Sequence, residues 1–247
     1  MVNMYGAKIT LTPVGPIADE EDAIQRLWDY FRVLYKNGQI LDNYEVIRAD
    51  TGFMAFVTMT ADDALDEKYG NVYVRDYLER VEQIFVVSSE ILGENVNHDD
   101  GCVCERPSWY FLEATFFQSD SPVLCGDCGE TRSLVTLPHL FDEDEHYSIL
   151  GWVDAYNCVN KLWFEGLWDR FTSRQLGQAD SQLSKWGLEI CGELEKLTGA
   201  RSYYALWHRT LTPPVQCPVC GSVWLPVKVG ERTFVRCEGC RLVSETK

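Results

Sequence analysis

The first part of the chain alternates between strand-like and helix-like patterns of apolar residues. Residues 7–13 alternate apolar and polar positions, as a strand with one buried face does. A helix is predicted to begin at Asp19, whose side chain can cap it, and to end at Asn37-Gly38. Its apolar side chains recur at helical spacing and form a single face, made of Ile24, Leu27, Trp28, Phe31, Leu34 and Tyr35.

The same alternation continues through residue 117. Residues 44–49 and 53–59 predict a hairpin around the turn Asp50-Thr51-Gly52. A second helix is predicted from the spacing of Val74, Tyr77, Leu78, Val81, Ile84 and Phe85. Residues 86–92 and 108–117 predict two further strands. The order β-α-β-β-α-β predicts an α+β fold, a ferredoxin-like split βαβ sandwich that is extended by one strand.

The second part of the chain is predicted to be mainly helical before it turns to short strands. The acidic stretch 142–145 precedes a predicted helix of about 25 residues, which a polar loop at 172–179 ends. A second helix runs from Asp180 to Leu197 and is stopped by Gly199. The two helices are expected to pack as a pair on the sandwich.

Eight of the ten cysteines fall into two sets of four. The C-terminal set has two C-x2-C pairs that are separated by sixteen residues, and its members are Cys217, Cys220, Cys237 and Cys240. A C-x2-C pair lets two thiolates of one tight turn bind the same ion, and a second pair completes a tetrahedral Zn²⁺ site. Strand-like residues lie between the pairs, so a closed zinc ribbon is predicted here.

The upstream set has a C-x-C pair, twenty intervening residues and a C-x2-C pair, and its members are Cys102, Cys104, Cys125 and Cys128. We predict a second zinc site at these cysteines. One alternative pairs Cys125 and Cys128 with His98 or His139, which leaves the other two cysteines incidental. A redox role for the C-x2-C pair is a further alternative, which requires a thiol with a depressed pKa.

Cysteine use also depends on the cellular compartment. The start of the chain lacks the features of a secretory signal, and no apolar run approaches the roughly 20 residues of a membrane span. We therefore expect a cytoplasmic protein with reduced thiols, in which paired cysteines bind metal rather than form disulfides. The single cysteines Cys158 and Cys191 lie in apolar helical stretches and are predicted to be buried core residues.

These observations divide the chain into three expected parts. Residues 1–140 would form the α/β sandwich with the first zinc site inserted as a knuckle. Residues 141–211 would form the helical region packed on it, and residues 212–247 the C-terminal zinc ribbon, which follows the stiff connector Thr212-Pro213-Pro214. A ribbon of this size buries little apolar surface, so we expect zinc to supply its folding energy.

The formal net charge of −16 argues against duplex DNA or an anionic membrane as the main partner. Acidic residues gather in two short stretches, which would be the first candidates for binding a basic protein: Glu20, Glu21 and Asp22, and Asp142, Glu143, Asp144 and Glu145. Only the C-terminal ribbon is weakly basic. A nucleic-acid surface there would consist of Lys228, Arg232, Arg236, Arg241 and Trp224, although Trp224 and Phe234 equally fit the small core of the ribbon.

No catalytic motif stands out in the sequence. The four histidines are scattered, and neither a nucleophile elbow, a phosphate-binding loop nor a zinc-protease signature is present. The segment from Tyr203 to Trp207 is predicted to belong to the core. We therefore expect that the chain is not an enzyme.

Several segments together resemble a known bacterial family. They are the Cys125–Cys128 knuckle followed by Leu134 to Leu140, the Tyr203-Tyr204 segment, and the stretch from Cys217 to Ser244. The chain resembles uncharacterised zinc-ribbon proteins described as "Zn-ribbon-containing, possibly nucleic-acid-binding". The resemblance implies zinc on the four C-terminal cysteines and on the Cys125 knuckle. The chain differs from the family's usual sequence in the tyrosine-rich segment and in the residues after Ser244.

Two functions follow as hypotheses. The first is a zinc-stabilised protein-interaction module, most specifically an immunity protein that binds and neutralises a basic antibacterial toxin, because a strongly acidic surface steers and complements a basic partner. The alternative is a zinc-ribbon protein that binds RNA or single-stranded nucleic acid through its basic ribbon residues.

Overall fold

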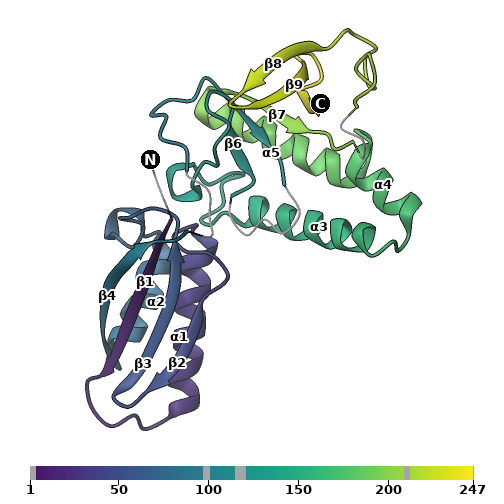
Figure 1. Cartoon of the computed structure of the whole chain (residues 1–247). Helices are drawn as coiled ribbons and strands as arrows, with labels where there is room; N and C mark the ends of the chain where they lie inside the picture. The colour runs from purple at the N-terminus through teal and green to yellow at the C-terminus, as the bar shows by residue number, and fades with distance from the viewer. Residues whose placement is uncertain (1–3, 97–100, 115–120, 209–211, 247) are drawn as a thin grey trace. The chain divides into compact units, whose positions relative to one another are not determined.

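The computed structural model describes residues 4–96, 101–114, 121–208 and 212–246, and the chain has a mixed α+β fold. Its contacts divide it into two compact units, of which Figure 1 shows the first mainly in purple to blue and the second mainly in teal to yellow. The N-terminal unit comprises Met1–Gly101 and Ser133–Tyr147, and the C-terminal unit comprises Cys102–Arg132 and Ser148–Lys247. Each unit is therefore built from two separate segments of the sequence.

The N-terminal unit has the predicted order β-α-β-β-α-β. Its elements are β1 (Tyr5–Pro13), α1 (Glu20–Lys36), β2 (Glu45–Ala49), β3 (Gly52–Met59), α2 (Val72–Glu82) and β4 (Phe85–Glu94), with 3₁₀ turns at Glu67–Tyr69 and Leu134–Thr136. The predicted second helix is too long at its end. Phe85, which was expected in the helix, instead begins β4, and its ring is buried in the core of this unit.

Helix α1 begins and ends where the sequence predicts. The Asp19 carboxylate accepts a hydrogen bond of 3.0 Å from the backbone N–H of Asp22 and so caps the helix. Asn37 follows the last helical residue, and Gly38 adopts a left-handed conformation with φ of 75°. A Cβ atom on Gly38 would lie 2.4 Å from Cβ of Leu134, so glycine is required there for packing as well.

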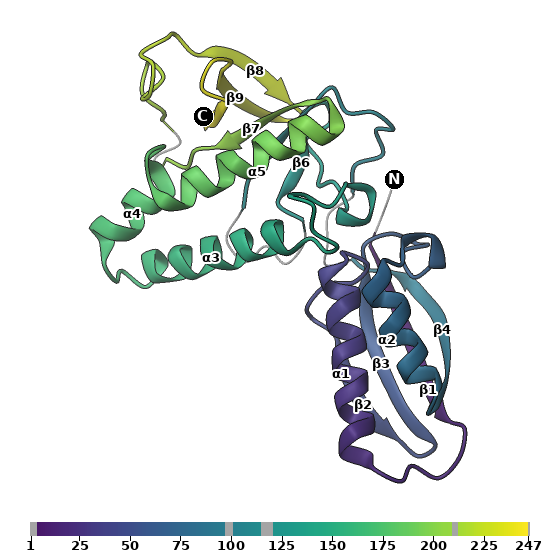
Figure 2. The same ribbon diagram turned by 180° about the vertical axis from the view of Figure 1, so that it is seen from behind.

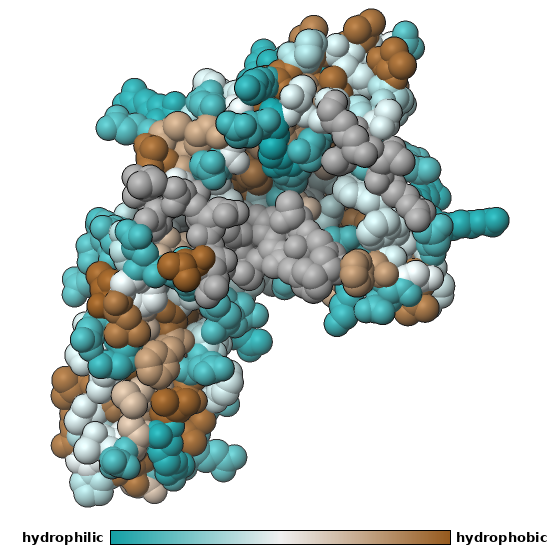
Figure 3. All heavy atoms as spheres, viewed as in Figure 1, coloured by the Kyte–Doolittle hydropathy of each residue, from teal (hydrophilic) through white to brown (hydrophobic). Residues whose placement is uncertain are grey.

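The four strands of this unit form an antiparallel sheet in the order β2-β3-β1-β4. Figure 2 shows α1 and α2 lying across one face of the sheet, where Ile9 and Leu11 pack with Leu27 and Phe31 in the core. The opposite face carries exposed side chains such as Phe56 on β3. Hydrophobic and hydrophilic side chains are interspersed over the visible surface of this unit (Figure 3).

The C-terminal unit contains the remaining helices and strands. They are β5 (Trp109–Leu112), β6 (Val123–Cys125), α3 (Tyr147–Phe164), α4 (Asp169–Gly177), α5 (Gln182–Thr198), β7 (Arg201–Ala205), β8 (Leu225–Val229), β9 (Arg232–Cys237) and β10 (Leu242–Thr246). The single helix of about 25 residues and the loop at 172–179 were both wrong predictions. The helix is interrupted after α3 because Gly166 and Trp168 adopt left-handed conformations, with φ of 69° and 51°. Helix α4 begins directly after Trp168. No helix in the described ranges has the length and apolar composition to cross a membrane.

The strands of the C-terminal unit form one sheet in the order β6-β5-β7-β10-β9-β8. Strand β7 pairs in parallel with both β5 and β10, and the remaining pairs are antiparallel. The predicted fifth strand of the N-terminal sandwich therefore belongs to the other unit. The expected boundaries at residues 140 and 211 also do not separate the compact units, because the ribbon strands continue the sheet that β5 and β7 begin.

Both faces of this sheet are covered within the unit. On one face the Tyr204 ring packs against α5 at Gly187, where a Cβ atom would lie 2.3 Å from the ring, and Trp152 of α3 lies edge-on to it. On the other face the buried side chains form a cluster of Trp109, Phe111, Leu124, Tyr203, Val229, Phe234 and Val243. The prediction that Tyr203, Tyr204 and Phe234 are core residues is confirmed.

A buried polar cluster holds residues 133–147 against the end of α1. The Asn37 carboxamide donates hydrogen bonds to Gln39 Oε1 (2.9 Å) and to the Tyr69 carbonyl (2.7 Å), and its oxygen lies 3.2 Å from Nε2 of His139. The His139 and His146 rings meet edge to face, with centroids 4.5 Å apart. This cluster places a buried imidazole, His146, beside a half-buried one, His139, inside the N-terminal unit.

Acidification is expected to destabilise the N-terminal unit through His146. Burial, followed by repulsion from His139, lowers the pKa of His146 from 6.5 to about 3. Between these values the unfolded chain binds a proton that the native chain does not. The free energy of unfolding therefore falls by up to about 1.4 kcal/mol per pH unit below the unfolded pKa, and this contribution is constant above it.

Urea unfolding at about pH 7, 6 and 5 measures this slope. The variant His146→Gln should show a shallower pH dependence than the unmodified chain, because glutamine does not titrate. Loss of metal at low pH affects both proteins equally and cancels in the comparison. Identical slopes for the two proteins would contradict the assignment.

Candidate metal centres

The structure brings the cysteines together in the two predicted sets. The Sγ atoms of each set lie within 4.8 Å of one another, and the sets are Cys102, Cys104, Cys125 and Cys128, and Cys217, Cys220, Cys237 and Cys240. A zinc ion with four thiolates at about 2.3 Å has sulfur atoms about 3.8 Å apart. Both clusters therefore have the ligand type, number and spacing of a tetrahedral metal site.

The upstream cluster is built on the end of β6. Cys125 is the last residue of this strand, and its N–H donates to the Glu130 carbonyl at 2.9 Å. The chain then turns so that the N–H of Gly129 donates to the Cys125 carbonyl at 2.8 Å, which places Cys125 and Cys128 on one tight loop. The Gly129 conformation, with φ of 88°, is one that favours glycine.

Gly126 inside this loop lies directly under an aromatic ring. A Cβ atom there would be 2.0 Å from ring atoms of Trp109, and the Gly126 N–H donates to the Trp109 carbonyl at 2.9 Å. The Asp127 carboxylate accepts the backbone N–H of Ser108 at 2.6 Å. Both middle residues of the loop, Gly126 and Asp127, therefore hold it against the start of β5.

The C-x-C pair is held by its own contacts and is not incidental. The N–H of Cys102 donates to the Thr131 carbonyl at 2.8 Å, beyond the C-x2-C loop. Nη1 of Arg132 donates to the Cys104 carbonyl at 2.8 Å and lies 3.8 Å from Sγ of Cys102. The alternative ligand His139 belongs to the buried cluster of the N-terminal unit, and His98 lies outside the described residues.

The C-terminal cluster has the same loop geometry. The N–H of Gly221 donates to the Cys217 carbonyl at 2.9 Å, and that of Cys217 to the Ser222 carbonyl at 2.8 Å. The opposite ligands are supplied where β9 ends at Cys237, whose Sγ lies 3.6 Å from that of Cys220. The two loops therefore face each other across the ribbon.

The residue after the second cysteine is left-handed in all three C-x2-C loops. Gly129 and Gly221 have φ of 88° and 71°, as their glycine identity suggests. In the third loop the corresponding residue is Arg241, which adopts φ of 54° although its side chain disfavours a left-handed conformation. Its guanidinium donates to Glu195 at 2.7 Å and lies over the Tyr203 ring, which holds this residue in place.

The thiol environments differ within each cluster. Hydrogen bonds from Ser222, followed by those from the neighbouring cysteines, lower the pKa of Cys220 to about 6. Burial raises the pKa of Cys125, Cys128, Cys237 and Cys240. A raised pKa in the Cys125–Cys128 pair is the opposite of what a redox-active thiol needs. All ten cysteines are free thiols in this structure.

The two single cysteines differ from each other. Cys191 of α5 is buried, as predicted. Cys158 of α3 is exposed, so that prediction was wrong. The apolar residues around it face the core on the other side of the helix, where Trp152 and Tyr156 are buried.

The basic residues of the ribbon are engaged with the protein itself. Arg236 lies over the rings of Trp109 (4.9 Å) and Tyr203 (5.0 Å) and forms an ion pair with Glu238 at 2.7 Å. Arg232 forms bidentate ion pairs with Glu113 and Glu245 and stacks on the Phe234 ring. Arg241 pairs with Glu195. Trp224 is buried, and its indole N–H donates to the Pro214 carbonyl at 2.8 Å. Of the five residues proposed to contact nucleic acid, only Lys228 is exposed.

The two acidic stretches lie at opposite ends of α1. Glu20–Asp22 form its first turn, whereas Glu145 pairs with Lys36 of the last turn at 3.1 Å. Seventeen helical residues span about 25 Å, so the stretches are separated by that length and do not form one patch. Glu20 is also engaged in an ion pair with Arg48.

Sequence reasoning missed two residues that shape the upstream site, Arg132 and Trp109. Arg132 follows the knuckle by only four positions, and a basic residue close to thiolates is a recognisable signal. The packing of Trp109 on Gly126 has no local signal, because it depends on the pairing of β5 with β6.

Family models match two successive segments of the chain. Residues 104–207 match a domain of unknown function, DUF2310, and residues 4–93 match another domain of unknown function, DUF8589. The second match spans the sheet and helices of the N-terminal unit. The first begins at Cys104 and ends before the C-terminal cysteine cluster, and each covers less than half of the chain.

Two curated relatives come from Haemophilus influenzae, and both are described as uncharacterized proteins. One is 27% identical over 206 residues, which cover 78% of this chain and 77% of the relative. The other is 27% identical over 166 residues, which cover 63% of this chain and 79% of the relative.

Two solved structures with different described functions have a weak structural similarity to this chain. A conserved protein of unknown function from Bacteroides thetaiotaomicron, described as a possible oxidoreductase, has a TM-score of 0.31 and 14% identity, covering 38% of this chain and 99% of that chain. SnoaB, a cofactor-independent oxygenase from Streptomyces nogalater, has a TM-score of 0.29 and 10% identity, covering 38% and 94%. At these TM-scores the likeness assigns no activity.

The expectation that this chain is not an enzyme is corrected by that comparison. It rested on the lack of a cofactor motif, an open metal position and a recognisable nucleophile–base pair in the sequence. SnoaB is an oxygenase that needs no cofactor, so the lack of such motifs does not exclude catalysis.

Replacing Gly126 with alanine should destabilise the upstream site. The new Cβ would lie 2.0 Å from the Trp109 ring, which has no room to move because it is buried. We expect a loss of about 1–3 kcal/mol of stability and weaker metal retention, measured by thermal unfolding with and without chelator. Gly239→Ala is the matched control, since nothing lies within 4 Å of its added Cβ. Equal stability of the two variants would refute this packing argument.

Proposed function

We propose that each cysteine cluster binds one structural Zn²⁺ and that the chain is a zinc-stabilised protein-interaction module. The observation that carries the zinc assignment is the convergence of four Sγ atoms within 4.8 Å at both places. Four thiolates favour Zn²⁺ over hard cations such as Mg²⁺ and Ca²⁺. They also fill the tetrahedral shell, so these ions would hold structure rather than activate water.

Zinc would cross-link separate segments of the C-terminal unit. The upstream ion would attach residues 102–104 to the end of β6, at one edge of the six-stranded sheet. The C-terminal ion would close the loop before β8 onto the end of β9, at the other edge. Structural zinc contributes about 10–16 kcal/mol of apparent binding energy in small zinc-finger peptides, which is ample to fix both edges.

The finer fold assignments are part of the proposal. The sheet order β2-β3-β1-β4, with both helices on one face, supports a ferredoxin-like arrangement for the N-terminal unit. Two C-x2-C loops joined by the β8–β9 hairpin support a zinc ribbon at the C-terminus and the resemblance to zinc-ribbon proteins.

The proposed partner is a basic protein. A net charge of −16 favours encounter with a positively charged surface. Neutralisation of a cognate antibacterial toxin is the most specific form of this proposal. The first turn of α1 is the best starting surface, because Glu21 is exposed there.

No observation favours the nucleic-acid alternative. The arginines that it invoked cover the aromatic cluster of the sheet and pair with glutamates, and Trp224 is buried. A base could not stack on that indole without opening the ribbon.

Native mass spectrometry tests the metal assignment. We expect two zinc ions on the 28.3 kDa chain and one ion in each of the variants Cys128→Ser and Cys240→Ser, because each change breaks one cluster. The control Cys158→Ser should keep both ions, since Cys158 is exposed and outside the clusters. A metal-free chain, or a mass reduced by disulfide formation, would rule the assignment out.

Co-expression with the product of the neighbouring gene tests the immunity function. If that product is toxic and this chain neutralises it, growth is restored. Glu21→Lys should weaken the complex several-fold through slower association, while the exposed Asp62→Lys elsewhere on the same unit should change it less. Undiminished toxicity in the presence of the folded, zinc-loaded chain would end this proposal.

A further inference from the structure

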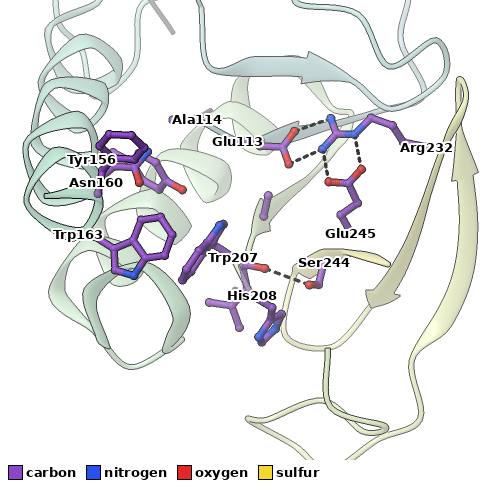
Figure 4. A pocket seen from close by; sticks show the side chains of 13 residues that line it. Glu113, Ala114, Tyr156, Asn160, Trp163, Trp207, His208, Arg232, Ser244 and Glu245 are labelled. Atoms are coloured by element: carbon purple, nitrogen blue, oxygen red, sulfur yellow. Dashed lines mark hydrogen bonds and ion pairs between the residues drawn. The ribbon is translucent and has the colours of Figure 1, made fainter. Parts of the chain in front are cut away.

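The C-terminal unit contains a cavity of about 440 Å³ that is separate from both cysteine clusters. It is open to solvent on part of its boundary and is lined by the last turns of α3, by the segments after β5 and β7, and by β9 and β10 (Figure 4). Cavities of about 300–1,000 Å³ are the usual size of small-molecule sites. Its lining combines aromatic rings, one carboxamide and an ion-pair cluster.

Asn160 is the most informative residue of this lining. It lies on α3, only 7% of its surface is exposed, and it lines the cavity. Its carboxamide has no hydrogen-bond partner among the residues that the structure describes. The carboxamide atoms are not fully enclosed by protein but reach the open space of the cavity, where a ligand can replace solvent as their hydrogen-bond partner. It offers one donor and one acceptor group to a ligand.

Aromatic rings form the walls beside this carboxamide. The indoles of Trp163 and Trp207 meet edge to face with centroids 4.9 Å apart, and Tyr156 is buried next to Asn160 on the same helix. Figure 4 shows Tyr156, Asn160 and Trp163 extending from α3, with Trp207 opposite Trp163. Such walls favour a flat ring, which can stack or pack edge-on against them.

The far side of the cavity carries an excess of negative charge. Arg232 donates to both oxygens of Glu113 at 2.7 Å, and to Glu245 at 2.9 and 3.0 Å. Its guanidinium is therefore saturated by two carboxylates and has little capacity left for an anionic ligand. Two glutamates against one arginine leave a net negative charge, which disfavours phosphates and carboxylic acids.

One more acceptor faces the cavity. The Ser244 hydroxyl donates to the Leu206 carbonyl at 3.0 Å, so its proton is used and its oxygen lone pairs remain available. A ligand with an N–H group could donate to this oxygen while it pairs with the carboxamide.

From these contacts we infer that the cavity is a binding site for a small planar nitrogen heterocycle without negative charge. Asn160 reads its hydrogen-bonding edge, the Trp163 and Trp207 indoles pack against its ring, and the Glu113–Arg232–Glu245 cluster rejects acidic analogues. This site is independent of metal binding and of the protein partner proposed above.

Isothermal titration of the zinc-loaded full chain tests the site with three matched pairs of probes. The pairs are adenosine and adenosine monophosphate, uridine and uridine monophosphate, and nicotinamide and nicotinate. At least one uncharged member should bind once per chain with a Kd on the order of 0.1 mM, and its acidic counterpart at least about tenfold more weakly. Failure of all three uncharged probes to bind, or equal binding of the acidic ones, overturns the inference.

Variants then place the binding in this cavity. Asn160→Leu keeps the side-chain volume but removes the carboxamide, and it should raise the Kd about tenfold. Trp163→Leu is a second variant near the end of α3, where a change is less disruptive to folding, and it should also weaken binding. Lys161→Ala, an exposed neighbour on the same helix, is the control and should bind like the unmodified chain. Unchanged affinity in a folded Asn160→Leu or Trp163→Leu variant would overturn the site.

Discussion

The four sulfur atoms in each cluster of the C-terminal unit lie within 4.8 Å of one another. Four neighbouring thiolates repel one another, so the thiols cannot all ionise without a cation between them. Burial further raises the pKa of Cys125, Cys128 and Cys240. A divalent cation reverses this balance, because its charge stabilises the thiolates that burial disfavours. The geometry of both loops therefore makes physical sense when a metal is bound.

The two clusters lie at the two edges of the six-stranded sheet, whose strands are short. The sheet runs from β6 to β8, and each of these edge strands adjoins one cluster. The edges approach each other, since a Cβ atom on Gly230 of the β8–β9 turn would lie 2.9 Å from the Cys128 carbonyl oxygen. The arginine side chains then cover the aromatic face that the helices leave free. Exposed strand edges are a hazard for soluble proteins, and here a cysteine cluster adjoins the strand at each edge of the sheet.

The sequence predicted the features that depend on short-range patterns. The ends of α1 follow from Asp19 and Gly38, and the cysteine spacing anticipated both clusters. Parallel pairing of β7 with β5 and β10 joins distant segments, so residues 109–112 and the ribbon were assigned to the wrong units. Such pairing leaves no periodic signal in the sequence around either strand.

Charge was the least reliable guide to the role of single residues. The basic residues of the ribbon suggested a nucleic-acid surface, but Arg232 and Arg236 serve the protein's own ion pairs and aromatic packing. Asn160 carried no signal at all, since one asparagine in an apolar helix is unremarkable until its surroundings are known. Both cases required the tertiary contacts of the C-terminal unit.

Eight cysteine thiolates are proposed to bind two zinc ions as closed four-sulfur sites. X-ray absorption at the zinc edge of the purified chain measures the ligands directly. We expect four sulfur atoms at about 2.3 Å around each zinc ion, with no nitrogen or oxygen ligand. A shell that contains light atoms, or fewer than four sulfurs per zinc, would contradict it.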